Sequence, residues 1–171
     1  VFVLAGCSED DLKKTSAVLD SPTVENDFDR WLTKNYLEPY NIDFKYRFKD
    51  VLGDMDYNLT PADYGQAIKL AKLTLHLTLQ VYDEVTGNRQ FISENFPKIV
   101  HVIGSPAYNE NNNIVLGVAE GGKMMTLYQV NIIDYLLETK NIDQLNELFF
   151  KTMHHEFGHI LHQTRPYSTD F

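Results

Sequence analysis

The chain has 171 residues, of which 43% are hydrophobic and 12% aromatic, and a formal net charge of −9 at pH 7. This length and composition predict one domain with a substantial hydrophobic core. The excess of acidic residues argues against a nucleic-acid partner and against a basic patch that binds anionic lipid.

The first seven residues, Val1-Phe2-Val3-Leu4-Ala5-Gly6-Cys7, are apolar and end in small residues before a cysteine. We expect residues 1–7 to be the end of a signal peptide with a lipoprotein cleavage box, and Cys7 to carry a lipid. The alternative is a short buried strand with a core cysteine. The absence of a second cysteine and the charged residues that follow favour lipidation.

Residues 8–22 are predicted to form a flexible tether. Its acidic start, Ser8-Glu9-Asp10-Asp11, resembles the surface-export signals of some outer-membrane lipoproteins, although a solvated linker has the same composition. No apolar run approaches the roughly 18 residues of a membrane-spanning helix. The lipid would therefore be the only membrane attachment.

The first half of the domain is predicted to contain two helices and a strand. A helix that begins after residue 23 carries Phe28, Trp31, Leu32 and Tyr36 and is stopped by Pro39. Residues 41–48 alternate apolar and polar side chains, which is typical of a strand with one buried face. Thr60-Pro61 is an N-cap and first-turn pair that opens a long helix, closed by Gly87 after about residue 86. His76 in that helix is expected to be structural.

The second half is predicted to contain a strand at 98–104 and a hairpin of strands 113–118 and 123–130 around Glu120-Gly121-Gly122. A final helix begins near Asn141, a good N-cap, and continues to about Gln163 before Pro166. The resulting fold class is α+β, with a small mixed or antiparallel sheet and a long backing helix.

The final helix contains His155-Glu156-Phe157-Gly158-His159, an HExxH motif. At about 100° per residue, the two histidines lie within about 40° of each other, with Glu156 about 100° from His155. Apolar residues occupy the opposite side of the helix: Phe149, Met153, Phe157, Ile160 and Leu161. This pattern predicts a helix that is buried along its back and exposes the histidine pair to a cleft.

Two imidazoles one turn apart with an adjacent carboxylate are a zinc site in which His155 and His159 are ligands and Glu156 is the general base. Zn²⁺ lowers the pKa of a bound water from 15.7 to about 7 and polarises a scissile carbonyl. The predicted chemistry is hydrolysis, most commonly of an amide.

A catalytic zinc usually has three protein ligands, and this motif supplies two. The metzincin pattern is excluded, because it requires Gly and His where this chain has His162 and Arg165. The third ligand is either an upstream side chain or a residue beyond Phe171, and we expect the latter.

Three other side chains near the motif could contribute to the site or to packing around it. His162 shares the angular face of the ligands but lies about 10 Å along the helix from His155, so it is expected to line the cleft wall or to hydrogen-bond to a ligand, or else to be an ordinary surface histidine. His154 points away and is expected to pack on the flank. Tyr167 could donate to an oxyanion, although packing is the commoner role of such a tyrosine.

Taken together, the lipobox, the residues Trp31, Tyr36 and Pro39-Tyr40-Asn41-Ile42, the Thr60-Pro61 pair and the motif through Gln163 resemble zinc metallohydrolase lipoproteins of outer-membrane substrate import. These are found beside starch-utilisation-type import lipoproteins. The resemblance implies a zincin-like, gluzincin-type peptidase on the cell surface. Residues 23–171 would be the N-terminal part of its domain, with a later helix completing the zinc site.

The leading functional hypothesis is a surface-anchored zinc metallopeptidase of the outer membrane that cleaves peptide bonds in proteins or glycoproteins for nutrient import. The alternative is a non-catalytic lipoprotein of an outer-membrane import complex. Glu156 favours the enzyme, because a structural metal site needs no general base. A weaker possibility is hydrolysis of an amide or ester in a non-peptide substrate.

Overall fold

The described part of the protein, residues 25–48 and 58–164 of the computed structural model, is built on three long helical runs. In the first, α1 (Asp27–Leu32) continues through a π-helical turn, Thr33–Leu37, into α2 (Glu38–Tyr40). The second joins α3 (Tyr64–Thr74) to α4 (Gln80–Thr86) through Leu75–Leu79, and the third joins α7 (Ile142–Leu145) to α8 (Thr152–Thr164) through Asn146–Lys151. Two shorter helices, α5 (Gln90–Asn95) and α6 (Ile133–Glu138), complete the helical layer, and a 3₁₀ turn, Val130–Ile132, precedes α6.

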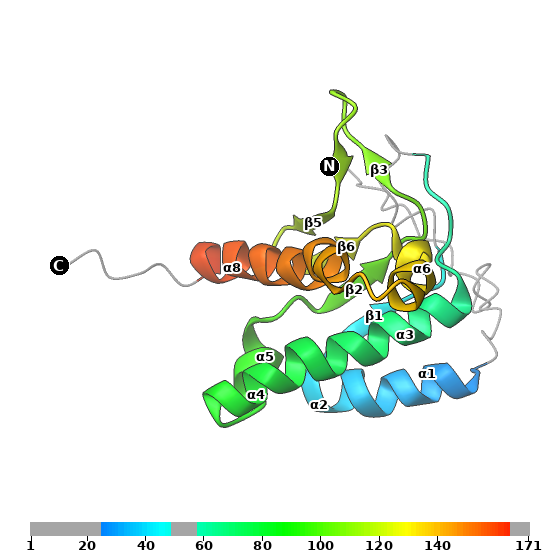
Figure 1. Cartoon of the computed structure of the whole chain (residues 1–171). Helices are drawn as coiled ribbons and strands as arrows, with labels where there is room; N and C mark the ends of the chain where they lie inside the picture. The colour runs from blue at the N-terminus through cyan, green and yellow to red at the C-terminus, as the bar shows by residue number, and fades with distance from the viewer. Residues whose placement is uncertain (1–24, 49–57, 165–171) are drawn as a thin grey trace, which may run out of the picture.

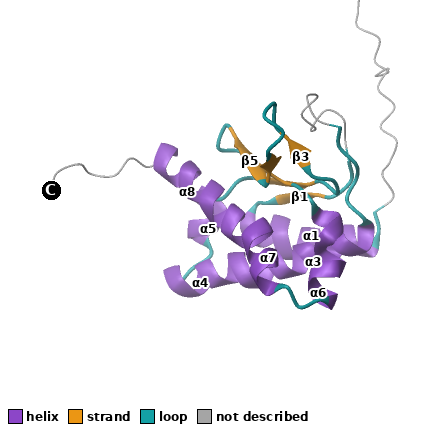
Figure 2. Cartoon of the chain, turned by 45° about the horizontal axis from the view of Figure 1, so that its top comes forward, coloured by secondary structure: helices purple, strands orange, loops and turns teal. Residues whose placement is uncertain are grey.

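A four-stranded mixed sheet lies above α1, α3 and α4 (Figures 1 and 2). Its strands are β1 (Asp43–Lys45), β2 (Ile99–Val102), β6 (Met124–Leu127) and β5 (Gly117–Glu120), in that spatial order. β1 pairs with β2 and β2 with β6 in parallel, whereas β5 and β6 form an antiparallel hairpin. A separate two-stranded ribbon pairs β3 (Ala107–Tyr108) with β4 (Ile114–Val115). The predicted α+β class with a small mixed sheet is confirmed.

One face of the sheet forms the main core with the helices. The register places Phe44 opposite Val100 and Val100 opposite Met125, so these side chains share a face. All three are buried in one cluster with residues of the three helical runs. The opposite face carries His101 and Thr126, and a smaller cluster around Ile103, Ala107 and Tyr128 packs there.

The predicted end of the first helix is wrong by two residues. Pro39 lies inside the helical run, which ends at Tyr40 because Asn41 adopts a left-handed conformation with φ 55°. In the π-helical turn before it, the Glu38 N–H donates to the carbonyl of Thr33, five residues back. This altered hydrogen-bond spacing accommodates a proline that would break a regular α-helix.

The predicted start of the second helix is also wrong. Thr60-Pro61 is extended: the Thr60 N–H donates to Ser105 Oγ (3.0 Å), and Pro61 forms an antiparallel bridge with Ile103. The N-cap is Asp63, whose side chain accepts from the Gln66 N–H at 3.1 Å. Contacts with a distant segment therefore override a good local capping pair. The predicted end at Gly87 is confirmed, with φ 76°.

The predicted hairpin is present, and Gly121 and Gly122 form its turn with φ 54° and 69°. The predicted strand 113–118 is instead divided between β4 and β5, and β3, α5 and α6 were not predicted. The third helical run begins as expected, with Asn141 accepting from the Gln144 N–H at 3.2 Å.

His101 is an ionisable side chain in the interior of the sheet. It is fully buried on β2 between Lys45 and Thr126 of the neighbouring strands, and neither ring nitrogen has a hydrogen-bond partner among the described residues. Burial lowers the pKa of His101 below its ordinary value near 6.5, so folding favours the neutral ring.

We predict that the free energy of unfolding falls as the pH drops below about 6.5, because the unfolded chain then binds a proton at His101 that the folded protein excludes. His101→Leu should reduce this loss by on the order of 1 kcal/mol for each pH unit below 6.5. Urea unfolding at pH 7.5 and 5.5 measures the difference. Part of the dependence should remain, since burial also lowers the pKa of His154. The exposed His76→Leu is the matched control; an unchanged pH dependence in His101→Leu would contradict this account.

Candidate metal centre

His155 and His159 present their rings to each other on the exposed side of α8. Their Nε2 atoms are 2.9 Å apart, their ring centroids are 4.5 Å apart and their planes are nearly perpendicular at 89°. Both residues are exposed. The i, i+4 spacing in the regular α-helical part of the run produces this convergence, because residues one turn apart share a face.

The opposite side of α8 is buried, as predicted. Met153, Phe157 and Ile160 are at most 2% exposed. The Phe157 ring packs edge-on against Tyr82 (centroids 5.3 Å apart) and lies 4.9 Å from Phe96. This aromatic packing fixes the rotation of α8 about its axis and so decides that the histidine pair faces outward.

The edge strand β5 lies alongside α8 and runs in the same direction (Figure 1). At its start, a Cβ added to Gly117 would lie 2.7 Å from Thr152 Cγ2, and at the hairpin turn a Cβ on Gly122 would lie 3.9 Å from Ile160 Cγ2. The histidine pair lies between these two contacts along the helix. Glycine at position 117 therefore allows the strand to approach the motif helix closely.

A hollow of about 340 Å³ opens between the start of β5 and the first turns of the motif helix. It is lined by Leu116, Gly117, Glu147, Lys151, Thr152, His155 and Glu156. Glu156 is half-buried and shares this hollow with His155. Sequence reasoning missed Lys151 and Glu147, although their spacing of four and eight residues before His155 was a signal that they could share its face.

The histidine pair fits two positions of a zinc site. Two ligands at tetrahedral angles with Zn–N distances of about 2.0–2.1 Å have nitrogens about 3.3 Å apart, close to the separation seen here. Imidazole nitrogen is a preferred ligand of Zn²⁺. Within residues 25–48 and 58–164, however, no third His, Cys, Asp or Glu joins the pair. The described residues thus supply two of the three protein ligands that a catalytic zinc usually has.

The other histidines have different environments. His154 packs against Tyr82, with 2.9 Å between Nδ1 and the hydroxyl, which confirms the expected flank packing. His76 is exposed, and its Nδ1 lies 2.7 Å from Gln80 Oε1 one turn along the same helical run, which agrees with the expected structural role. His162 is exposed near the end of α8, and its cleft-wall role stays a prediction. Cys7 and Tyr167 lie outside the described residues.

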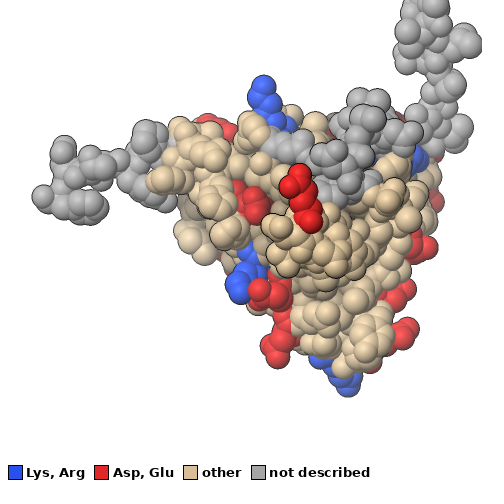
Figure 3. All heavy atoms as spheres, turned by 90° about the horizontal axis from the view of Figure 1, so that it is seen from above, with Lys and Arg blue, Asp and Glu red and all other residues tan. Residues whose placement is uncertain are grey.

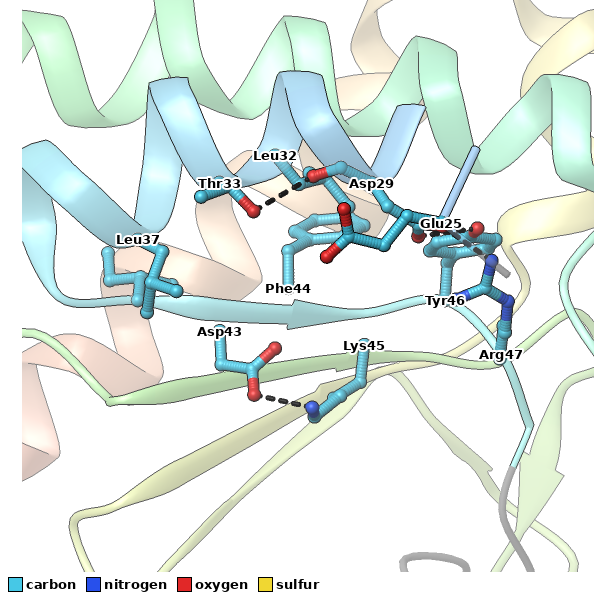
Figure 4. A pocket seen from close by; sticks show the side chains of 11 residues that line it. Glu25, Asp29, Leu32, Thr33, Leu37, Asp43, Phe44, Lys45, Tyr46 and Arg47 are labelled. Carbon is cyan, nitrogen blue, oxygen red and sulfur yellow. Dashed lines mark hydrogen bonds and ion pairs between the residues drawn. The ribbon is translucent and has the colours of Figure 1, made fainter. Parts of the chain in front are cut away.

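A second hollow, of about 310 Å³, lies between the first helical run and β1 (Figure 4). Four of the five charged side chains that line it are paired: Asp29 accepts from Arg47 (2.6 Å) and from the Tyr46 hydroxyl (2.9 Å), and Lys45 pairs with Asp43. Burial raises the pKa of Asp29, but hydrogen bonds from Arg47, the Asn26 N–H and Tyr46 outweigh it, so the pKa is lowered overall. These pairings connect α1 with the segment after β1 and indicate a structural network.

The described atoms on the face in Figure 3 show separated basic side chains and no continuous positive surface. None of the helices in the described residues combines the length and apolarity of a membrane span.

Comparison with known proteins places these features in a family. Residues 21–171 match the family described as "Putative zinc-binding metallo-peptidase". The crystal structure of a putative zinc-binding metallo-peptidase from Bacteroides caccae ATCC 43185 is 45% identical, covering 84% of this chain and 52% of that one, with a TM-score of 0.63. This chain therefore spans about half the length of that protein. A search of curated proteins finds no match.

We predict that Gly117→Ala destabilises the protein by about 1–3 kcal/mol, because the added methyl group collides with Thr152 Cγ2. Thr152 is buried, so its side chain has little room to move away. Thr152→Ser removes that methyl group and keeps the hydroxyl that donates to the Glu147 carbonyl (3.1 Å). Chemical unfolding of both single variants and the double variant should show that Thr152→Ser recovers part of the loss. Strictly additive effects would disprove the collision.

Proposed function

The chain belongs to the "Putative zinc-binding metallo-peptidase" family, and from this premise we propose that it hydrolyses peptide bonds at a zinc centre held by His155 and His159. The observation that carries the proposal is the convergence of the Nε2 atoms of two exposed histidines, 2.9 Å apart, next to a hollow that His155 and Glu156 line together. A site that only held metal for stability would be closed and would have no use for this carboxylate.

Each residue of the motif has a distinct role in this proposal. His155 and His159 hold the ion through neutral imidazole nitrogens, with the ring protons on Nδ1. When bound, zinc supplies Lewis-acid chemistry, polarising a carbonyl and making water acidic near neutral pH. Glu156 accepts a proton from the attacking water and returns it to the leaving amine. Its half-buried position in the hollow that His155 also lines supports this role.

The open edge of β5 supports an extended peptide as the substrate. The Tyr128 N–H donates to the Leu116 carbonyl (3.3 Å), and hydrogen bonding alternates along an antiparallel pair. The backbone groups of Gly117 and Ala119 therefore point away from β6, toward the open edge. An extended substrate can add to this edge as a further strand, which places its backbone above the histidine pair.

We predict that Glu156→Gln in the full-length protein retains zinc but lowers peptide hydrolysis by several orders of magnitude, because the amide cannot accept the proton. His155→Ala should lose the metal as well as activity. Zinc content by mass spectrometry and cleavage of casein or a peptide library measure the two properties. His76→Ala, an exposed helical histidine, is the matched control and should change neither. Equal activity of Glu156→Gln and wild type would leave the non-catalytic import component as the better account.

We also propose that the enzyme is anchored to the outer membrane through a lipid on Cys7 and acts at the cell surface, trimming proteins or glycoproteins during nutrient import beside starch-utilisation-type lipoproteins. The support is the Leu4-Ala5-Gly6-Cys7 box and the acidic residues after it. The family match begins at residue 21, after most of the predicted tether 8–22.

Cys7→Ser should move the protein from the membrane fraction to the soluble fraction, since the thiol is the acylated atom. Mass spectrometry of the wild-type N-terminal peptide should find a lipid on Cys7, and protease treatment of intact cells should degrade the wild-type protein. Membrane retention of Cys7→Ser would refute the anchor, and protection from protease would refute the surface location.

A further inference from the structure

Lys151 is the single cation among the described residues that line the hollow beside the histidine pair. It lies four residues before His155 in the same helical run, so its side chain starts about one turn from the ligand position. The other charged groups in the hollow are the carboxylates of Glu147 and Glu156. Lys151 is therefore the group in this hollow that can attract an anionic part of a substrate.

Lys151 forms an exposed ion pair with Glu147. The ammonium Nζ lies 2.8 Å from both carboxylate oxygens of Glu147, but the two side chains are 64% and 53% exposed. An exposed pair of this kind contributes little to stability, because water competes for both charges. A carboxylate brought in by a bound substrate could therefore replace Glu147 at the ammonium at little cost.

The direction of a bound peptide follows from the arrangement of β5 and α8. The two elements run the same way, with Gly117 beside Thr152 and Gly122 near Ile160. A peptide that adds antiparallel to β5, the more stable ladder, enters at the hairpin turn and leaves past Gly117. Its residues next to Lys151 are then those on the C-terminal side of the bond held at the histidine pair.

We infer that Lys151 selects substrates with a carboxylate on the C-terminal side of the cleaved bond, an inference that rests on the proposed peptidase function. The carboxylate comes either from an Asp or Glu side chain or from the free C-terminus of the peptide. In both cases the ammonium donates charge-assisted hydrogen bonds to it and exchanges Glu147 for the substrate. Lys151 is thus a specificity-determining residue.

The test uses zinc-loaded full-length protein and matched peptides that carry Glu or Gln directly after the cleaved bond, each with a free or an amidated C-terminus. We expect kcat/KM to be about tenfold higher for the better carboxylate peptide than for its neutral counterpart. Comparison of the four peptides tells which carboxylate is used. The preference should weaken as salt is raised, because the group is exposed.

Lys151→Glu should abolish or invert this preference, with Lys-containing peptides then favoured, and Lys151→Arg should keep it. Lys72→Glu makes the same charge change at an exposed helical lysine outside the hollow and should leave the preference intact. Circular dichroism checks that each variant is folded. Equal cleavage of carboxylate and neutral peptides by wild type, or an unchanged preference in Lys151→Glu, would overturn the role of Lys151 and leave the peptidase function standing. No cleavage of any peptide would overturn both.

Discussion

The packing of the buried back of α8 is the constraint on which the candidate centre depends. Met153, Phe157 and Ile160 are almost completely removed from solvent, and burying each such side chain is worth roughly 1.5–3 kcal/mol. Rotating the helix to bury the histidines would expose these groups. Burial of these three side chains therefore orients His155 and His159 toward solvent and keeps their Nε2 atoms on one side of the helix.

The same packing places α8 beside β5, and the direction of the two elements sets the direction in which a peptide would bind between them. α8 lies against β5 closely enough that position 117 has no room for a side chain, and the strand and helix run the same way. The helix contributes the ionisable side chains, and the strand contributes backbone groups that point away from β6. A peptide bound between them would form backbone hydrogen bonds with β5, and its side chains would contact the helix. The strand would then contribute mainly to affinity and the helix mainly to specificity.

Local signals predicted the elements that local chemistry controls. The Asn141 cap, the left-handed Gly87 and the Gly121-Gly122 turn are all present, since each depends on a few neighbouring residues. The Thr60-Pro61 prediction is wrong because pairing with Ser105 and Ile103, more than 40 residues away, holds these residues extended. Short elements such as β3 and α5 have too few residues for a periodic pattern, and Pro39 depends on a π-helical turn that α-helical periodicity does not reveal.

By itself, the sequence determined the two imidazoles, their spacing of one helical turn, the neighbouring carboxylate and the apolar stripe behind them, because helical geometry converts residue spacing directly into direction. Only the tertiary structure decided that β5 is the strand beside this helix, that it runs parallel to α8, and that Lys151 and Glu147 share a hollow with His155 and Glu156. These facts depend on contacts between segments about 35 residues apart. Side-chain volume and backbone pairing across the whole core set such contacts, and no local pattern encodes them.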